Sequence, residues 1–147
     1  TTTITGLTGG AKWIGGVLAP NGKIYGIPGN SESVLIIDPV AGTADVTTIT
    51  GLTGGAKWIG GVLAPNGKIY GIPGNSESVL IIDPVAGTAD VTTITGLTGG
   101  AKWIGGVLAP NGKIYGIPLM SESVLIVSPG MPTMPIDPLL SPHLNKF

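Results

Sequence analysis

The sequence predicts an all-β fold built from three copies of one 45-residue unit, and two observations carry that prediction. The first is repetition: residues 2–46 and 47–91 are identical, and a third copy that starts at residue 92 matches them through Pro118. The second is composition: the 147 residues include 26 glycines and 13 prolines, and Val, Ile and Thr dominate the rest. Such a composition is typical of short strands joined by tight turns.

The first two strands of the unit are expected on either side of a tight turn. The first strand is predicted over Trp13–Leu18. The Asn-Gly pair that follows Pro20 indicates a type I′ hairpin turn. A second strand over 23–27 follows. The Gly15-Gly16 pair favours a crowded inner position for the first strand, because glycine lets two backbones approach closely.

Two further strands complete the unit after a polar loop over 28–32. The third is predicted over 33–38, where the unbroken apolar run Val34–Ile37 indicates burial on both faces. A turn over 39–44 then leads to a Thr-rich fourth strand over 46–50. Four short antiparallel strands in 45 residues are typical of one blade of a β-propeller. A monomeric β-trefoil or β-prism also has three four-stranded repeats, and both stay open as alternatives.

Two stretches of the unit resemble a known class of blade. The stretches 19–25 and 30–39 are similar to the blade pattern of natural propellers of the YVTN and NHL groups. They cover about half of each repeat. Together with the identity of the repeats, they make the chain resemble designed, symmetric propellers with identical blades, one kind of which has nine-fold symmetry. This resemblance implies a propeller fold and a designed origin, and it says little about function.

The third copy departs from the other two after Pro118. The sequence therefore divides into blades over 1–46, 47–91 and 92–129, the last incomplete, and a Pro-rich tail over 130–147. Pro135 and Pro138 fall where the second copy has Asp90 and Thr93. Because proline cannot donate a ladder hydrogen bond, the third blade is expected to lack a fourth strand of its own.

The start of the chain offers the strand that the third copy lacks. The segment that aligns with 46–50 consists of Thr1, Thr2, Thr3, Ile4 and Thr5. Propellers typically have about 4–8 blades, so three blades do not close a ring. We therefore expect this segment to complete the third blade of another copy in a closed homo-oligomer. A trimer with nine blades is favoured over a dimer with six.

Charge and composition argue against several classes of function. The net charge is −1, only 10% of residues are charged and there is no arginine, which disfavours nucleic acid and anionic membrane surfaces as partners. Without cysteine, and with His143 as the only histidine, no metal site is expected and no cofactor is implied. No base accompanies the many hydroxyls, so the chain is not expected to be an enzyme. We expect a soluble protein, and the sequence leaves its compartment open.

One surface remains as a candidate binding site. The loops before each first strand and after each second strand should share one face, which carries Lys12, Asn30, Glu32, Lys57, Asn75, Glu77, Lys102 and Glu122. Met120 replaces the third asparagine. Trp13 and its copies are expected to pack between blades. Two functions follow as hypotheses: a self-assembling structural scaffold without catalytic activity, and a module that binds a glycan or another ligand through this loop face.

Overall fold

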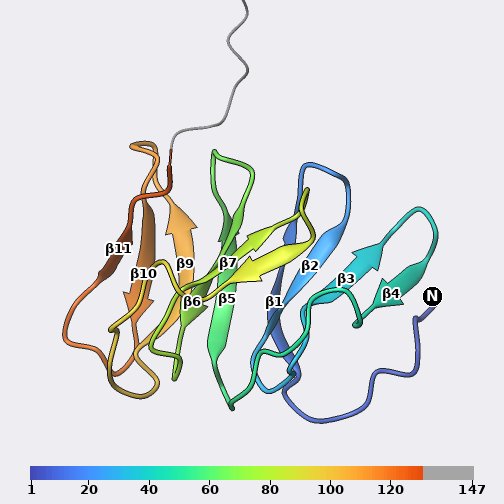
Figure 1. Ribbon diagram of the computed structural model, residues 1–147, viewed down its shortest axis with the longest axis horizontal. Helices are drawn as coiled ribbons and strands as arrows, with labels where there is room; N and C mark the ends of the chain where they lie inside the picture. The colour runs from blue at the N-terminus through green and yellow to red at the C-terminus, as the bar shows by residue number, and fades with distance from the viewer. Residues whose placement is uncertain (131–147) are drawn as a thin grey trace, which may run out of the picture.

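The computed structural model describes residues 1–130, which form three antiparallel sheets standing side by side (Figure 1). All eleven elements of this part are strands, as the sequence predicts. None of the residues from 1 to 130 belongs to a helix that could cross a bilayer. The remaining residues, 131–147, include most of the predicted Pro-rich tail, which therefore lies outside the described part.

Each sheet is a meander in which neighbours in sequence are neighbours in space. Blade 1 consists of β1 (Trp13–Leu18), β2 (Ile24–Pro28), β3 (Leu35–Asp38) and β4 (Thr43–Asp45). Blade 2 consists of β5 (Trp58–Leu63), β6 (Ile69–Pro73), β7 (Leu80–Asp83) and β8 (Thr88–Asp90). Blade 3 consists of β9 (Trp103–Leu108), β10 (Ile114–Pro118) and β11 (Leu125–Val127).

The hairpin between β1 and β2 differs from the predicted type I′ turn. A type I′ turn needs positive φ at two successive residues, but here only Gly22 has one, with φ 83°. The Gly22 N–H donates to the Ala19 carbonyl at 3.0 Å, and the Ala19 N–H donates to the Lys23 carbonyl at 2.9 Å. The loop is therefore a type I turn over 19–22 whose last residue is the left-handed glycine. Pro20 suits it, because its fixed φ matches the first central position.

The fourth strand begins earlier than the sequence predicts, at Thr43. The Asp38 carboxylate accepts the N–H groups of Val40 and Ala41, both at 3.0 Å, and the Asp38 carbonyl accepts the Gly42 N–H at 2.8 Å. These bonds close the turn within 39–42. The chain is therefore extended again by Thr43, inside the predicted turn.

The predicted strand over 46–50 is wrong, because no strand forms there. The Asp45 carboxylate accepts the Thr47 N–H at 2.7 Å and the hydroxyls of Thr47 and Thr48. Local bonds of this kind compete with a sheet ladder and end β4. The residues 1–5, which align with this segment, also lie outside any strand. The pairing of these residues with another copy stays a prediction.

Glycines on the first strands let the blades approach at their inner edge. A Cβ on Gly15 would meet the Gly60 Cα at 3.1 Å, and a Cβ on Gly60 would meet the Gly105 Cα at 3.0 Å. The strands β1, β5 and β9 accordingly lie next to one another in that order. This arrangement confirms that the first strand is the inner strand of each blade.

Between blades 1 and 2 lies an apolar core to which each blade gives one face. Blade 1 contributes Val17, Tyr25, Ile27, Val34 and Ile36, and blade 2 contributes Trp58, Ile69, Leu80 and Ile82. The equivalent residues of blades 2 and 3 form a second core. Trp58 and Trp103 are buried in these cores, as predicted, whereas Trp13 is only half-buried.

The three blades follow one another as in a propeller, and the trefoil and prism alternatives are wrong. The sheet of blade 3 has three strands within residues 1–130. The positions equivalent to β4 are 133–135, which lie outside the described residues. The missing fourth strand of this blade therefore stays a prediction.

Candidate functional site

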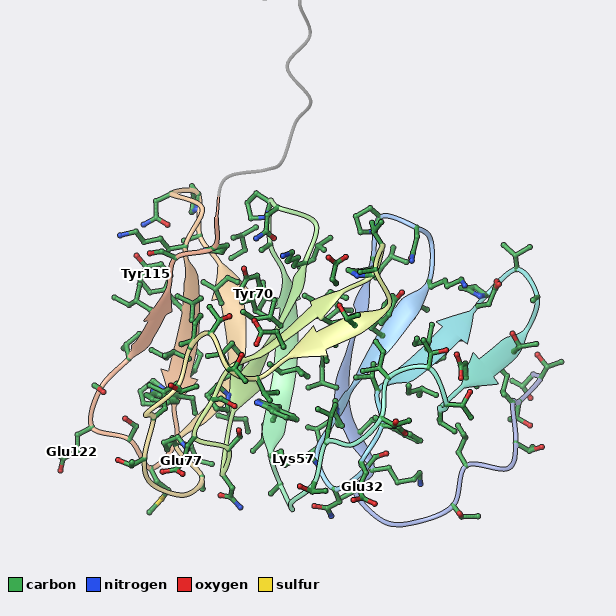
Figure 2. The ribbon with its side chains drawn as sticks, viewed as in Figure 1. Glu32, Lys57, Tyr70, Glu77, Tyr115 and Glu122 are labelled. Atoms are coloured by element: carbon green, nitrogen blue, oxygen red, sulfur yellow. The ribbon has the colours of Figure 1, made fainter. Side chains whose placement is uncertain are left out.

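The predicted binding residues lie along one edge of the molecule. Figure 2 shows Glu32, Lys57, Glu77 and Glu122 in a row at the lower edge, away from Tyr70 and Tyr115. This edge carries the loops before each first strand and after each second strand. Some of its residues, however, bond to a neighbouring blade, and others do not.

Two of the predicted lysines are buried ties between blades. Lys57 is 4% exposed, and its ammonium donates to the carbonyls of Gly29, Ser31 and Gly54 at 2.7–2.8 Å. Lys102 repeats the arrangement one blade further. An ammonium group has three N–H donors, so all three are used. Burial lowers the pKa of Lys57, while the charge of Glu32 opposes that shift. Lys57 and Lys102 therefore hold blades together and offer nothing to a ligand.

The predicted asparagines also tie neighbouring blades. The side-chain oxygen of Asn30 accepts the Ala56 N–H at 2.8 Å, and its amide donates to the Gly10 carbonyl at 3.3 Å. Ala56 has a φ of 47°, which costs energy in any residue with a Cβ. Asn75 makes the same bond to Ala101. These bonds support a strained backbone, and in the third copy Met120 offers only a thioether, which is a weak acceptor.

The glutamates and Lys12 are not tied to a neighbouring blade, whereas Asn30 and Asn75 are exposed but already bonded. Glu32, Glu77 and Glu122 are exposed. Lys12 differs from its two copies: it is half-buried and its ammonium donates to the Gly9 carbonyl alone, at 2.6 Å. The first blade therefore carries a lysine whose bonding is incomplete by comparison with the same residue in blades 2 and 3.

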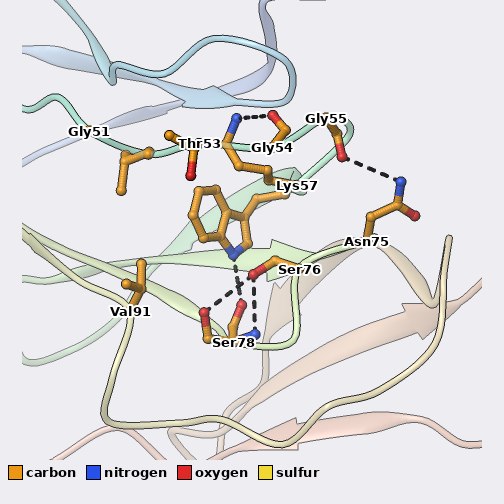
Figure 3. A pocket seen from close by; sticks show the side chains of 11 residues that line it. Gly51, Thr53, Gly54, Gly55, Lys57, Asn75, Ser76, Ser78 and Val91 are labelled. Atoms are coloured by element: carbon orange, nitrogen blue, oxygen red, sulfur yellow. Dashed lines mark hydrogen bonds between the residues drawn. The ribbon is translucent and has the colours of Figure 1, made fainter.

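A hollow of about 450 Å³ lies beside Trp58 between the loops of the same edge (Figure 3). Most of its polar groups are already engaged. The indole N–H of Trp58 donates to the Ser78 carbonyl at 2.8 Å, and the Ser76 and Ser78 hydroxyls bond to each other at 3.2 Å. Thr53 remains as an exposed hydroxyl on the rim. The hollow has the size of a small ligand site but few free polar groups to recognise a ligand.

The two ends of the blade row carry apolar surfaces. The end at blade 1, named here the head face, is the side of that blade that carries Trp13, Ile24 and Ile37, which are half-buried. Their equivalents in blade 2 are Trp58, Ile69 and Ile82, which pack in the core against blade 1. Nothing within residues 1–130 covers the head face in this way.

The other end is named the tail face and consists of Val107, Ile117, Val124 and Ile126 on blade 3. Val107 is 60% exposed and Val124 51%, whereas the equivalent Val62 and Val79 of blade 2 are 9% and 0% exposed. The tail face thus equals the side of blades 1 and 2 that packs against the next blade. Head and tail faces are the two halves of the interface that occurs twice inside the chain.

Sequence reasoning did not single out these apolar faces as a candidate site. The signal was the repeat itself. Any residue that is buried between two identical units must be uncovered in the terminal unit, so the exposed set could be read from the register of the strands.

Comparison with known proteins supports the fold. No protein-family model and no curated protein matches the sequence. The chain is similar in structure to a catalytically inactive virginiamycin B lyase from Staphylococcus aureus with quinupristin, at 14% identity and a TM-score of 0.60. That match covers 85% of this chain and 44% of the lyase.

Two further structures are similar over most of the chain. An auxiliary nutrient binding protein from Bacteroides ovatus matches at 18% identity and a TM-score of 0.61, covering 87% of this chain and 29% of that one. Hydrazine synthase from Kuenenia stuttgartiensis matches at 18% identity and a TM-score of 0.58, covering 87% and 35%. The chain thus spans less than half the length of each. At these identities the likeness shows the fold alone, which is of the β-propeller type.

Proposed function

We propose that this chain is a structural scaffold that assembles with copies of itself, the head face of one copy packing on the tail face of the next. One observation carries the proposal: the two open faces are the two halves of an interface that the chain already forms twice. The two ends of one molecule therefore carry surfaces that pack against each other wherever both occur inside the chain. The scaffold has no catalytic role in this proposal.

The chemistry of the two faces favours their burial. Exposed apolar residues of this size, gathered on one sheet surface, mark interaction sites on folded proteins. A head-to-tail contact is heterologous, so repeated contacts produce either a closed ring or an open filament. Because successive blades already turn around a shared inner edge, we propose a closed ring.

The number of copies rests on the count of blades. Two copies give six blades, within the common range of about 4–8, and three give nine. The resemblance of the identical blades to designed propellers with nine-fold symmetry favours three copies. We therefore propose a designed, nine-bladed trimer, with a six-bladed dimer as the competing arrangement.

A pair of substitutions tests the assembly. Val107→Asp places a charge on the tail face and should convert the assembly to single chains. Val85→Asp is the matched control, because Val85 is 97% exposed in the turn between β7 and β8 and belongs to neither face. Native mass spectrometry should give three times the chain mass of 14.7 kDa for the unmodified protein and for the control.

Two outcomes contradict the scaffold. The first is an unmodified protein that stays a single chain at all concentrations. The second is an assembly that persists unchanged in the Val107→Asp variant, since the tail face would then be outside the interface.

A second candidate function is ligand binding at the loop edge. It is favoured by one observation: the hollow beside Trp58 recurs beside Trp13 and Trp103, with volumes of about 450, 410 and 350 Å³. These volumes fall in the range of about 300–1,000 Å³ that small-molecule sites occupy. A glycan screen should show saturable binding that weakens in a Thr53→Ala/Thr98→Ala variant. No saturable binding by the unmodified chain removes this candidate.

A further inference from the structure

We propose that residues Ile4–Lys12 form an arm that lies across blade 3 of another copy and ties the two chains together by backbone hydrogen bonds. The inference rests on the proposed head-to-tail assembly and names a second contact within it. The arm would take the place on blade 3 that residues 49–57 take on blade 1 and residues 94–102 take on blade 2. In this proposal the segment crosses the blade, instead of adding the fourth strand that the sequence predicts.

Blade 1 shows how such a segment is held. After β4 the chain crosses back over its own blade before it enters blade 2. The Val34 N–H donates to the Ile49 carbonyl at 3.0 Å, and the Leu52 N–H donates to the Glu32 carbonyl at 2.9 Å. The side chains of Ile49 and Leu52 are buried in the core between the blades.

Blade 2 repeats both bonds with the next segment. The Val79 N–H donates to the Ile94 carbonyl at 3.0 Å, and the Leu97 N–H donates to the Glu77 carbonyl at 2.9 Å. The crossing segment is therefore a regular part of the blade, although it is not a strand.

Blade 3 presents the same groups without such a segment in the described chain. Within residues 1–130, the Val124 N–H and the Glu122 carbonyl form no backbone hydrogen bond of this kind. Ile4 and Leu7 are the equivalents of Ile49 and Leu52. Ile4 is 42% exposed, whereas Ile49 is almost fully buried. Blade 3 thus offers an N–H donor and a carbonyl acceptor. The arm offers the matching carbonyl of Ile4 and N–H of Leu7, together with the two apolar side chains.

The far end of the arm carries the incomplete lysine. Lys57 bonds two carbonyls of the preceding blade, those of Gly29 and Ser31, which Lys12 lacks. The equivalent carbonyls on blade 3 belong to Leu119 and Ser121. The backbone that presents these carbonyls keeps its geometry: the N–H groups of both residues donate to the Lys102 carbonyl at 2.8 and 3.2 Å, as they do at the equivalent place in blade 2.

The base of the arm already has the backbone conformation found in the docked segments. Ala11 has a φ of 46°, which matches the 47° and 48° of Ala56 and Ala101 in the docked segments. The Ala11 carbonyl accepts the Asn30 N–H at 3.1 Å, and the Lys12 carbonyl accepts the Gly29 N–H at 2.9 Å. Because its base is fixed to blade 1, ordering the arm costs little at the moment of association.

The arm that lies across blade 3 is that of another copy, because the arm of the same chain begins at the opposite end of the blade row. The N-terminus lies beside blade 1 and β11 lies at the opposite end, with blade 2 between them (Figure 1). The charge on Lys12 also suits blade 3, which offers carbonyl oxygens and the carboxylate of Glu122, the equivalent of the Glu32 whose charge acts on Lys57.

Two cysteines test the arm directly, since the sequence contains none. Val34 and Ile49 are joined by a backbone hydrogen bond. Two residues joined in this way are close enough for a disulfide, which spans a Cα separation of about 4–7 Å. Mild oxidation of an Ile4→Cys/Val124→Cys variant should therefore yield covalently linked chains on a non-reducing gel. The matched control is Ile4→Cys/Val79→Cys, because Val79 is already covered by the chain's own Ile94.

The outcomes separate the arm from the scaffold. Linked chains with Val124→Cys and not with Val79→Cys support the arm. Equal linking in both variants, or no linking in a protein that assembles by native mass spectrometry, overturns the arm and leaves the scaffold standing. A protein that neither links nor assembles overturns both.

Discussion

Single residues decide how closely the blades of this chain approach. Gly60 lies in the left-handed region with φ 82° and has the Gly105 backbone where a Cβ would be placed, at 3.0 Å. Gly67 has the same φ, and nothing lies within 4 Å of its Cβ position. The two glycines therefore share one backbone requirement and differ only in the neighbouring blade.

This pair separates backbone strain from blade contact. Gly67→Ala should cost about 1 kcal/mol through the left-handed backbone alone. Gly60→Ala should cost about 3 kcal/mol, because blade 3 must also move away from blade 2. Urea unfolding midpoints measure both. Equal losses would show that the close approach of β5 and β9 contributes nothing to stability.

Two aspartates predict a loss of stability in acid. The Thr48 hydroxyl, helped by Thr47, lowers the pKa of Asp45 from 3.8 to about 2, and Thr93 and Thr92 do the same for Asp90. A carboxylate whose pKa is lower in the folded chain stabilises the fold fully above the unfolded pKa. That contribution is lost as the pH falls from about 4 toward 2.

We therefore expect the unfolding midpoint to fall between pH 4 and pH 2. A Thr48→Val/Thr93→Val variant removes the largest cause of the shift and should show a smaller fall. Part of the fall should remain, because bonds from Ala41 and Val40 also lower the pKa of Asp38. An unchanged pH dependence in the variant would contradict this account.

At the scale of elements, the sequence places the first three strands of a blade well and misplaces the fourth, and the carboxylates explain that difference. The strand Trp13–Leu18 is as predicted, and β2 and β3 are placed within two residues, because apolar runs and a glycine turn mark them. The fourth strand was missed because β-propensity favours Thr-rich 46–50. What decides its place is the bonding of Asp38 and Asp45 to nearby N–H and hydroxyl groups, which propensity does not contain.

The lysine ties between blades give a prediction of their own. Lys57→Met leaves the carbonyls of Ser31 and Gly54 without this donor and that of Gly29 with only the backbone N–H of residue 57, and should cost about 3 kcal/mol. Lys12→Met removes one exposed bond and should cost less than about 1 kcal/mol in the single chain. Thermal unfolding of dilute protein compares them.

Equal costs would mean that the ammonium groups of blades 2 and 3 do not hold the blades together. If the arm docks as proposed, the cost of Lys12→Met should appear in the assembly instead, as a higher concentration needed for half-association.

At the scale of the whole molecule, the repeat made the blade architecture predictable and the site less so. Identity of the copies indicated equal units, and equal units must pack alike. The loop edge was predicted as a free surface because its residues are polar, but Lys57 and Asn30 face backbone groups of another blade. Such contacts depend on how units stack, and the sequence of one unit does not contain that stacking.

The substitution of Met120 for asparagine has a mechanical consequence. Both joints inside the chain have an asparagine that accepts an alanine N–H, but the joint between copies would meet a thioether there. In a ring that contains both kinds of joint, the seam between chains is then the weaker link. Under load or denaturant, such a ring parts at its seams first, and releases whole three-bladed segments rather than single blades.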